Sequence, residues 1–139
     1  MLRPSSTGSL LRKLRIIVAD DNALFLQNLV LLLAVEFDVV ATAPDGEAAL
    51  DLVRRFRPDA VVVDLHLPVL NGIEIANALA KHRPGPPVVI CSVENDAEIA
   101  EAARKAGALA LVSKARLERD LALAVKSAVE GKGFVSPAE

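Results

Sequence analysis

Short apolar runs alternate with longer amphipathic stretches along this chain. Five runs of five or six residues are rich in Val, Ile and Ala and are too short for buried helices, so each is predicted to be a strand. The stretches between them carry apolar residues at helical spacing and are bounded by Pro, Gly, Asn or Asp. The predicted strands are Arg15–Ala19, Asp38–Ala43, Ala60–Asp64, Val88–Ser92 and Ala108–Ser113, and the predicted helices are Ala23–Phe37, Glu47–Phe56, Ile73–His82, Ala97–Ala106 and Arg116–Glu130.

This strict alternation of strands and helices predicts the fold class. Such a pattern requires a mostly parallel sheet that helices cover on both faces. Right-handed crossovers then favour an α/β, flavodoxin-like, doubly wound (βα)5 sheet with strand order 2-1-3-4-5. We expect one domain over residues 15–131, a disordered lead-in over residues 1–14, and a C-terminal tail or the start of a linker over residues 132–139.

The most informative stretch is AVVVDLHLPVLNG, residues 60–72. Its first four residues are apolar and run directly into Asp64, so a buried strand is predicted to end in a carboxylate. An unpaired buried carboxylate is costly, but the carboxyl edge of an open parallel sheet is where ligands bind. The ordinary interpretation is a strand that ends in a solvated Asp.

Matching chemistry follows three other predicted strands. Asp20 and Asp21 follow the first strand, Ser92 ends the fourth, and Lys114 follows the fifth. Three carboxylates at one edge would repel each other and raise the pKa of at least one, and a hard cation such as Mg²⁺ would cancel that repulsion. Taken singly, an Asp pair is often a helix cap, a Ser a turn residue and a Lys a solvated charge. Together they suit a site where a carboxylate accepts a phosphoryl group.

Composition narrows the possible partners and the location. The net charge of -2 and the absence of Trp and Tyr argue against direct nucleic-acid binding or membrane association. The single Cys91 excludes an internal disulfide, fits a cytoplasmic location, and is predicted to be an inert buried thiol. The apolar stretch Leu24–Val35 is too short to span a bilayer.

The segments IIVADDN, VVVDLHLPVLNGIE, VVICS and GALALVSKA resemble the receiver domain of two-component response regulators. The resemblance covers residues 15–131, nearly the whole chain. It implies a Mg²⁺-dependent phosphorylation of Asp64 by a sensor histidine kinase, and no enzymatic activity beyond the domain's own phosphorylation and dephosphorylation. It further implies that Mg²⁺ is held by Asp20, Asp21, Asp64 and the backbone carbonyl of His66, that Ser92 is the switch hydroxyl, and that Lys114 contacts the phosphoryl group.

Two sequence features bear on how such a receiver would pass its signal to an output domain. Leu111 stands where similar receivers usually carry Tyr or Phe, which leaves the usual readout face in doubt, although simple packing in the sheet is the plainer interpretation. The C-terminal stretch AVKSAVEGKGFVSPAE is similar to the link between receivers and the helix-turn-helix of LuxR-type transcription regulators. We therefore expect either the receiver part of a transcription regulator or a stand-alone receiver.

Other functions remain open at this point. A degenerate receiver could act as a phosphorylation-independent interaction module, and the intact acidic, hydroxyl and lysine positions argue against that. A phosphatase of the haloacid-dehalogenase type would need a second Asp where this chain has His66. A nucleotide site would need a glycine-rich first turn, which Asp20-Asp21-Asn22 lacks.

The first predicted helix is unusually apolar. A helix that packs on one sheet face needs an apolar stripe on one side only. We therefore expect a homodimer, or docking of an output domain, through the first and last helices. The expected core stripe is Phe25, Leu29 and Leu32, and the expected interface residues are Leu26, Val30, Ala34 and, on the last helix, Leu123.

Overall fold

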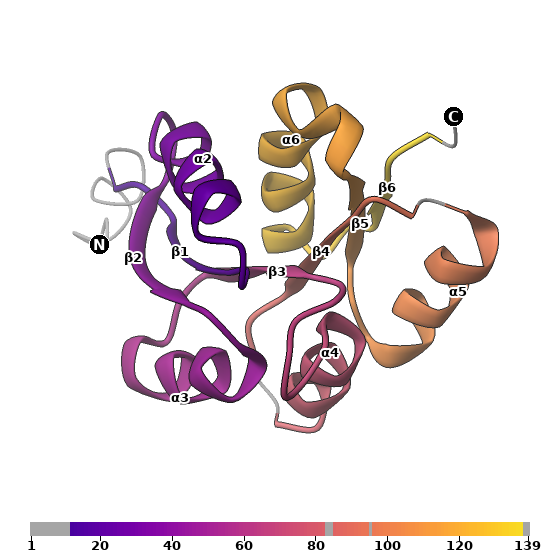
Figure 1. The fold of residues 1–139 in the computed structure, drawn as a ribbon, viewed down its shortest axis with the longest axis horizontal. Helices are drawn as coiled ribbons and strands as arrows, with labels where there is room; N and C mark the ends of the chain where they lie inside the picture. The colour runs from indigo at the N-terminus through magenta and orange to yellow at the C-terminus, as the bar shows by residue number, and fades with distance from the viewer. Residues whose placement is uncertain (1–11, 83–84, 95, 138–139) are drawn as a thin grey trace, which may run out of the picture.

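A computed structural model of the protein describes residues 12–82, 85–94 and 96–137. Its centre is a six-stranded parallel sheet in the order β2-β1-β3-β4-β5-β6 (Figure 1). The strands are β1 (Arg15–Ala19), β2 (Asp38–Ala43), β3 (Ala60–Asp64), β4 (Val88–Ser92), β5 (Ala110–Ser113) and β6 (Phe134–Val135). The helices are α2 (Ala23–Leu33), α3 (Gly46–Phe56), α4 (Gly72–Ala80), α5 (Ala97–Ala106), α6 (Leu117–Val129) and the 3-10 turn η1 (Lys114–Arg116).

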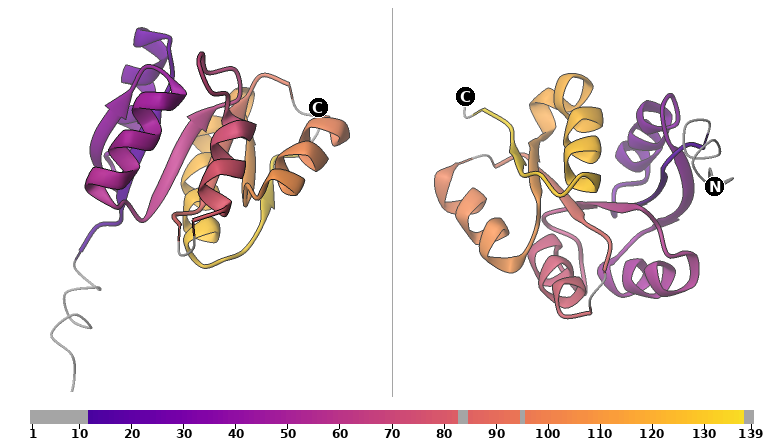
Figure 2. Two further views of the ribbon diagram at one scale, coloured as in Figure 1. Left: turned by 90° about the horizontal axis from the view of Figure 1, so that it is seen from below. Right: turned by 180° about the vertical axis from the view of Figure 1, so that it is seen from behind.

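Helices cover both faces of the sheet. Helices α2 and α6 lie on one face, and α3, α4 and α5 lie on the other (Figures 1 and 2). Each face has its own hydrophobic core, because alternate residues of a strand point to opposite sides. In β3, for example, Val61 and Val63 join the core under α3 and α4, whereas Val62 joins the core under α2 and α6. The predicted flavodoxin-like fold and its strand order are confirmed.

Side-chain caps explain where four helices begin. In each case an Asn or Asp with extended backbone accepts a hydrogen bond from the amide three residues later, which satisfies one of the free N–H groups of the first turn. At α4 the cap is reciprocal, since the Glu74 carboxylate also accepts from the Asn71 amide. The capping residues are Asn22, Asp45, Asn71 and Asp96.

The first helix is shorter than predicted. It ends at Leu33 and not at Phe37. The Phe37 amide donates to the Leu33 carbonyl at 2.8 Å, and its ring is only 3% exposed in the core with Leu33. Residues 34–37 thus form a turn that places Phe37 in the core directly before β2. The fifth strand is also shorter, because Gly107 ends α5 in the left-handed region (φ 102°) and residues 108–109 connect it to β5.

The C-terminal residues form a sixth strand where a tail or linker was expected. Phe134 donates to the Leu109 carbonyl and Ser136 donates to the Leu111 carbonyl, both at 2.9 Å, so this segment covers the edge of β5. At the other end, Leu14 packs on the core beneath α2, while residues 1–11 of the expected lead-in lie outside the described residues. Among the helices of the described residues, none is long and apolar enough to cross a membrane.

Candidate functional site

The sheet register brings the predicted site residues to one edge. Ala19 is level with Val63, and Asp64 is level with Cys91, so Asp20 and Ser92 flank Asp64 at the carboxyl ends of the neighbouring strands. Asp20 is 2% exposed and Asp64 is 7% exposed, whereas Asp21 faces solvent. One carboxylate oxygen from each of these three residues lies within 4.8 Å of the others. The expected convergence of the acidic residues is confirmed.

Lys114 ties two of these carboxylates together. Its Nζ lies 2.7 Å from Oδ1 of Asp64 and 3.4 Å from Oδ2 of Asp20. The Ser113 hydroxyl at the end of β5 accepts from the Ala115 amide and caps the 3-10 turn η1, which begins at Lys114. The ammonium group thus offsets part of the negative charge that the fold gathers at this edge.

Burial and charge shift two of the pKa values in this site. Burial raises the pKa of Asp20, and the negative charge of Asp64 adds to that, against the Asn22 amide and Lys114, which lower it. The rise predicted for one carboxylate is therefore found at Asp20, but its larger cause is burial and not repulsion. Burial works to lower the pKa of Lys114, but the hydrogen bond to Asp64 and the charges of Asp64 and Asp20 together raise it above its usual value. Lys114 is therefore a cation at neutral pH.

Ser92 at the end of β4 and His66 on the loop after β3 lie beside Asp64. Ser92 is 1% exposed, and its hydroxyl accepts from the Glu94 amide at 2.9 Å. The His66 amide donates to Oδ2 of Asp64 at 3.2 Å, and its ring Nε2 lies 2.7 Å from Oε1 of Glu94. The His66 ring is thus engaged with Glu94 across the two loops. Its backbone carbonyl stays a predicted metal ligand.

The loop between β3 and α4 has constrained backbone. Val69 has a positive φ of 71°, which is rare for a β-branched residue, and the Leu70 amide donates to the Pro68 carbonyl in a tight turn. At the end of this loop, a Cβ on Gly72 would lie 3.0 Å from the Asp64 carbonyl oxygen. The glycine therefore lets the start of α4 approach the strand that carries Asp64.

Two contributors to the site were not identified from the sequence as site residues. The Phe25 ring lies under the Lys114 ammonium, 4.1 Å from Nζ to the ring centroid, which is a cation–π contact. The Asn22 amide donates to Oδ1 of Asp20 at 2.8 Å while its side chain caps α2. Helical spacing placed Phe25 in the core stripe, but spacing does not reveal that Lys114 is its neighbour.

This donor set fits a divalent metal ion. Carboxylate oxygens are hard ligands, and Mg²⁺ uses one or two of them together with waters and phosphate oxygens. The exposed Asp21 lies at the solvent side of the cluster, and the buried Asp20 and Asp64 lie at its base.

Leu111, which stands where similar receivers usually carry Tyr or Phe, is 1% exposed in the core under α4 and α5. It therefore packs as a structural residue.

The sequence of this chain is similar to those of curated transcriptional regulatory proteins. The chain is 32% identical over 127 residues to the transcriptional regulatory protein DegU of Brevibacillus brevis, covering 90% of this chain and 54% of DegU. It is 34% identical over 116 residues to the transcriptional regulatory protein PdtaR of Mycobacterium tuberculosis, covering 83% of this chain and 56% of PdtaR. The chain thus spans about half the length of these curated relatives.

Solved structures of response regulators superpose on this chain. The signal receiver domain of the response regulator NarL from Mycobacterium tuberculosis superposes with a TM-score of 0.82 at 28% identity, covering 87% of this chain and 99% of that one. A LuxR-family two-component response regulator from Aurantimonas sp. SI85-9A1 superposes with a TM-score of 0.84 at 29% identity, covering 90% and 91%. The sequence profile described as the response regulator receiver domain matches residues 16–126. The chain therefore belongs to the receiver domain family of two-component response regulators.

Proposed function

We propose that Asp64 accepts a phosphoryl group from a sensor histidine kinase in a Mg²⁺-dependent reaction. The observation that carries the proposal is the placement of Asp64, which is nearly buried, 2.7 Å from a lysine cation and beside two further carboxylates. In this reaction a carboxylate oxygen of Asp64 attacks phosphorus, the bond from phosphorus to the kinase histidine nitrogen breaks, and an acyl phosphate forms.

The surrounding residues have distinct roles in this proposal. Asp20, Asp21 and the His66 carbonyl, with Asp64, would hold Mg²⁺, which supplies positive charge against the phosphoryl oxygens. Lys114, already hydrogen-bonded to Asp64, would pair with a phosphoryl oxygen once it is transferred. The Ser92 hydroxyl would leave the Glu94 amide and donate to another phosphoryl oxygen, which would move the loop before α5.

The domain is proposed to act as a switch and not as an enzyme with a separate substrate. Its curated relatives include transcriptional regulatory proteins, so we propose control of transcription in the cytoplasm as the output. Residues 132–139, of which Phe134–Val135 form β6, would then lead into the link to an output domain. The buried Cys91 fits this location as an inert thiol, since burial raises its pKa to about 12.

Phosphorylation with a small donor tests the proposal. The chain is incubated with acetyl phosphate and Mg²⁺ and its intact mass is measured. One added phosphate is expected for the native chain and for Asp51→Asn, a control carboxylate on the exposed side of α3, and none is expected for Asp64→Asn. A native chain that stays unmodified would favour the alternative function, a degenerate receiver that works as an interaction module.

We also propose that α2 and α6 form the homodimer or output-docking face. The exposed apolar residues differ in part from those expected, because Leu26 and Val30 are half-buried and Leu26 packs on the core. Leu123 is 55% exposed, as expected. The large apolar side chains that face solvent on and after α2 are Leu24, Leu31 and Val35, at 74%, 65% and 76% exposure.

Light scattering at increasing concentration, with and without beryllofluoride, tests this face. A dimer that Leu31→Glu abolishes is expected, while Ala80→Glu, an exposed position on α4 across the sheet, leaves it intact. A native chain that stays monomeric in both states would rule out the homodimer and leave output docking. Equal loss in both variants would place the interface elsewhere.

A further inference from the structure

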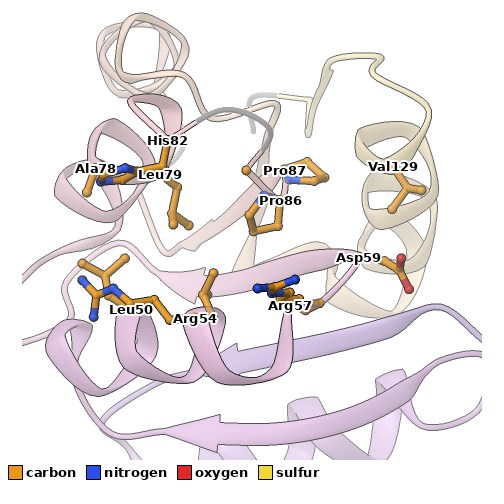
Figure 3. A pocket seen from close by; sticks show the side chains of 13 residues that line it. Leu50, Arg54, Arg57, Asp59, Ala78, Leu79, His82, Pro86, Pro87 and Val129 are labelled. Atoms are coloured by element: carbon orange, nitrogen blue, oxygen red, sulfur yellow. The ribbon is translucent and has the colours of Figure 1, made fainter.

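A cavity lies at the end of the sheet opposite Asp64, where β3 and β4 begin. It has a volume of about 840 Å³, within the usual range for small-molecule sites. Its walls come from the end of α3, the turn into β3, the end of α4, the loop before β4 and the end of α6 (Figure 3). The apolar lining includes Leu50, Val53, Ala78, Leu79, Pro86 and Val129.

The charged residues of this cavity are not balanced. The Asp59 carboxylate is already engaged, because Oδ2 accepts from the Arg15 amide at 2.7 Å and lies 3.8 Å from the Arg12 guanidinium. The Arg54 guanidinium pairs with Asp51 at 2.7 Å. Among the residues that the structure describes, the Arg57 guanidinium has no carboxylate partner. Of the cavity's described residues, Arg57 is therefore a cation without a counter-ion.

Arg57 holds this position in an unfavourable backbone conformation. It is the C-cap of α3 with φ 46° and ψ 65°, a left-handed conformation that usually selects Gly. Its amide donates to the Val53 carbonyl at 2.9 Å, so the cap is formed even though the residue is not Gly. Backbone strain that persists at a cavity points to a role for the side chain.

Arg15 offsets the partial negative charge at the C-terminus of α3, which would otherwise oppose an anion in the cavity. The C-terminus of a helix is the negative end of its dipole. The Arg15 Nη1 donates to the Phe56 carbonyl at 2.7 Å and to the Arg57 carbonyl at 3.2 Å, so these two free carbonyls of α3 are satisfied by a cation. The end of α3 therefore presents net positive charge to the cavity.

We propose that this cavity binds an amphipathic organic anion, an aromatic or branched aliphatic body that carries one carboxylate. The apolar body packs between Leu79 of α4 and Pro86 of the following loop (Figure 3). The carboxylate pairs with the Arg57 guanidinium, whose planar fork suits two parallel hydrogen bonds, and His82 offers a ring N–H from the facing wall. The site is independent of Asp64, so it does not rest on phosphorylation.

Titration with 2-naphthoate tests the proposal on the 139-residue chain. Methyl resonances of Leu50, Val53, Leu79 and Val129 are followed by NMR, with 2-naphthalenemethanol as the neutral probe of the same shape. Saturable shifts of these methyls are expected with 2-naphthoate, and about tenfold weaker binding of the alcohol is expected because it lacks the charge-assisted pair. Arg57→Gln should weaken 2-naphthoate by about tenfold and Arg57→Lys by less, since lysine keeps the charge but not the fork.

The matched control is Arg55→Gln, which removes a charge from the same helix end but not from the cavity lining. Its affinity for 2-naphthoate should stay within about twofold of the native value. Three results would overturn the proposal: no shift of the cavity methyls, equal binding of acid and alcohol, or equal weakening by Arg55→Gln and Arg57→Gln. No shift would mean that the cavity does not bind the probe. Equal binding of acid and alcohol would mean an apolar pocket without selectivity for charge, and equal weakening by both variants would mean general attraction to a basic surface.

Discussion

The substitution Asp120→Asn should release the C-terminal strand. Asp120 of α6 is 5% exposed, and its Oδ2 accepts from the Ser136 hydroxyl at 2.6 Å and from Arg116 Nε at 2.8 Å. The same Ser136 hydroxyl accepts from the Ser113 amide at 3.0 Å. One carboxylate thus connects α6, the end of β5 and the segment that follows β6. Asn keeps the shape of Asp but removes the negative charge that strengthens both hydrogen bonds.

The size of the effect follows from these contacts. A hydrogen bond to a charged group contributes about 1.5–3 kcal/mol, and Asn can retain the Ser136 contact as a neutral bond. We therefore expect a loss of about 2 kcal/mol in unfolding free energy, which for a domain of this length lowers the melting temperature by roughly 6 °C. The control Asp51→Asn removes an exposed ion pair with Arg54 and should change stability by less than about 0.5 kcal/mol.

Hydrogen exchange and a pH series measure the prediction. The Phe134 and Ser136 amides, which donate to β5, should exchange faster in Asp120→Asn, while the amides of β3 stay protected. The hydrogen bonds from Arg116 and Ser136 hold the pKa of Asp120 below its usual 3.8. Its stabilisation is therefore fully present above pH 3.8 and is lost as pH falls through the lower folded pKa. Unchanged exchange at Phe134 and Ser136, or a difference from the native chain that persists at low pH, would refute this reasoning.

Three further predictions concern the site itself. Mg²⁺ at a hundredfold excess over its Kd should stabilise the native chain by about 2.7 kcal/mol and Asp21→Ala much less, and equal shifts in melting temperature would place the metal elsewhere. Lys114→Ala should cost about 2 kcal/mol without metal, below the value for fully buried pairs because Lys114 is 18% exposed, and Mg²⁺ should restore most of it in thermal melts. Val69→Gly should stabilise the chain by up to about 1 kcal/mol in denaturant titrations, because Gly adopts the positive φ without the steric cost of a β-branched side chain.

The strands were predictable because short β-branched runs are rarely anything else. Their shared carboxyl-terminal edge was predictable because the strands of a parallel sheet all run in one direction. For that reason the meeting of Asp20, Asp64 and Lys114 was predictable from residue order alone. The early end of α2 was not, since Val35 and Glu36 are compatible with a helix and the packing of Phe37 in the core is not visible in the local pattern. Tertiary packing overrode local preference there.

The two-residue strand β6 could not be predicted either. A run of that length has no periodicity, and it exists because the edge of β5 offers the Leu109 and Leu111 carbonyls as acceptors. The contact of Phe25 with Lys114 has the same origin, since it depends on how α2 lies against the start of η1 and not on the spacing of either residue. Both features come from the assembled fold.

The central claim, that Asp64 carries the phosphoryl group, is tested most directly by borohydride reduction after phosphorylation. Borohydride reduces an acyl phosphate on aspartate to homoserine, so the modified residue is marked chemically and is located by peptide sequencing in a mass spectrometer. After incubation with acetyl phosphate and Mg²⁺, homoserine is expected at position 64 and not at the neighbouring Asp20 or Asp21. Homoserine at either of those positions, or a phosphorylated chain that retains aspartate at position 64, would contradict the assignment.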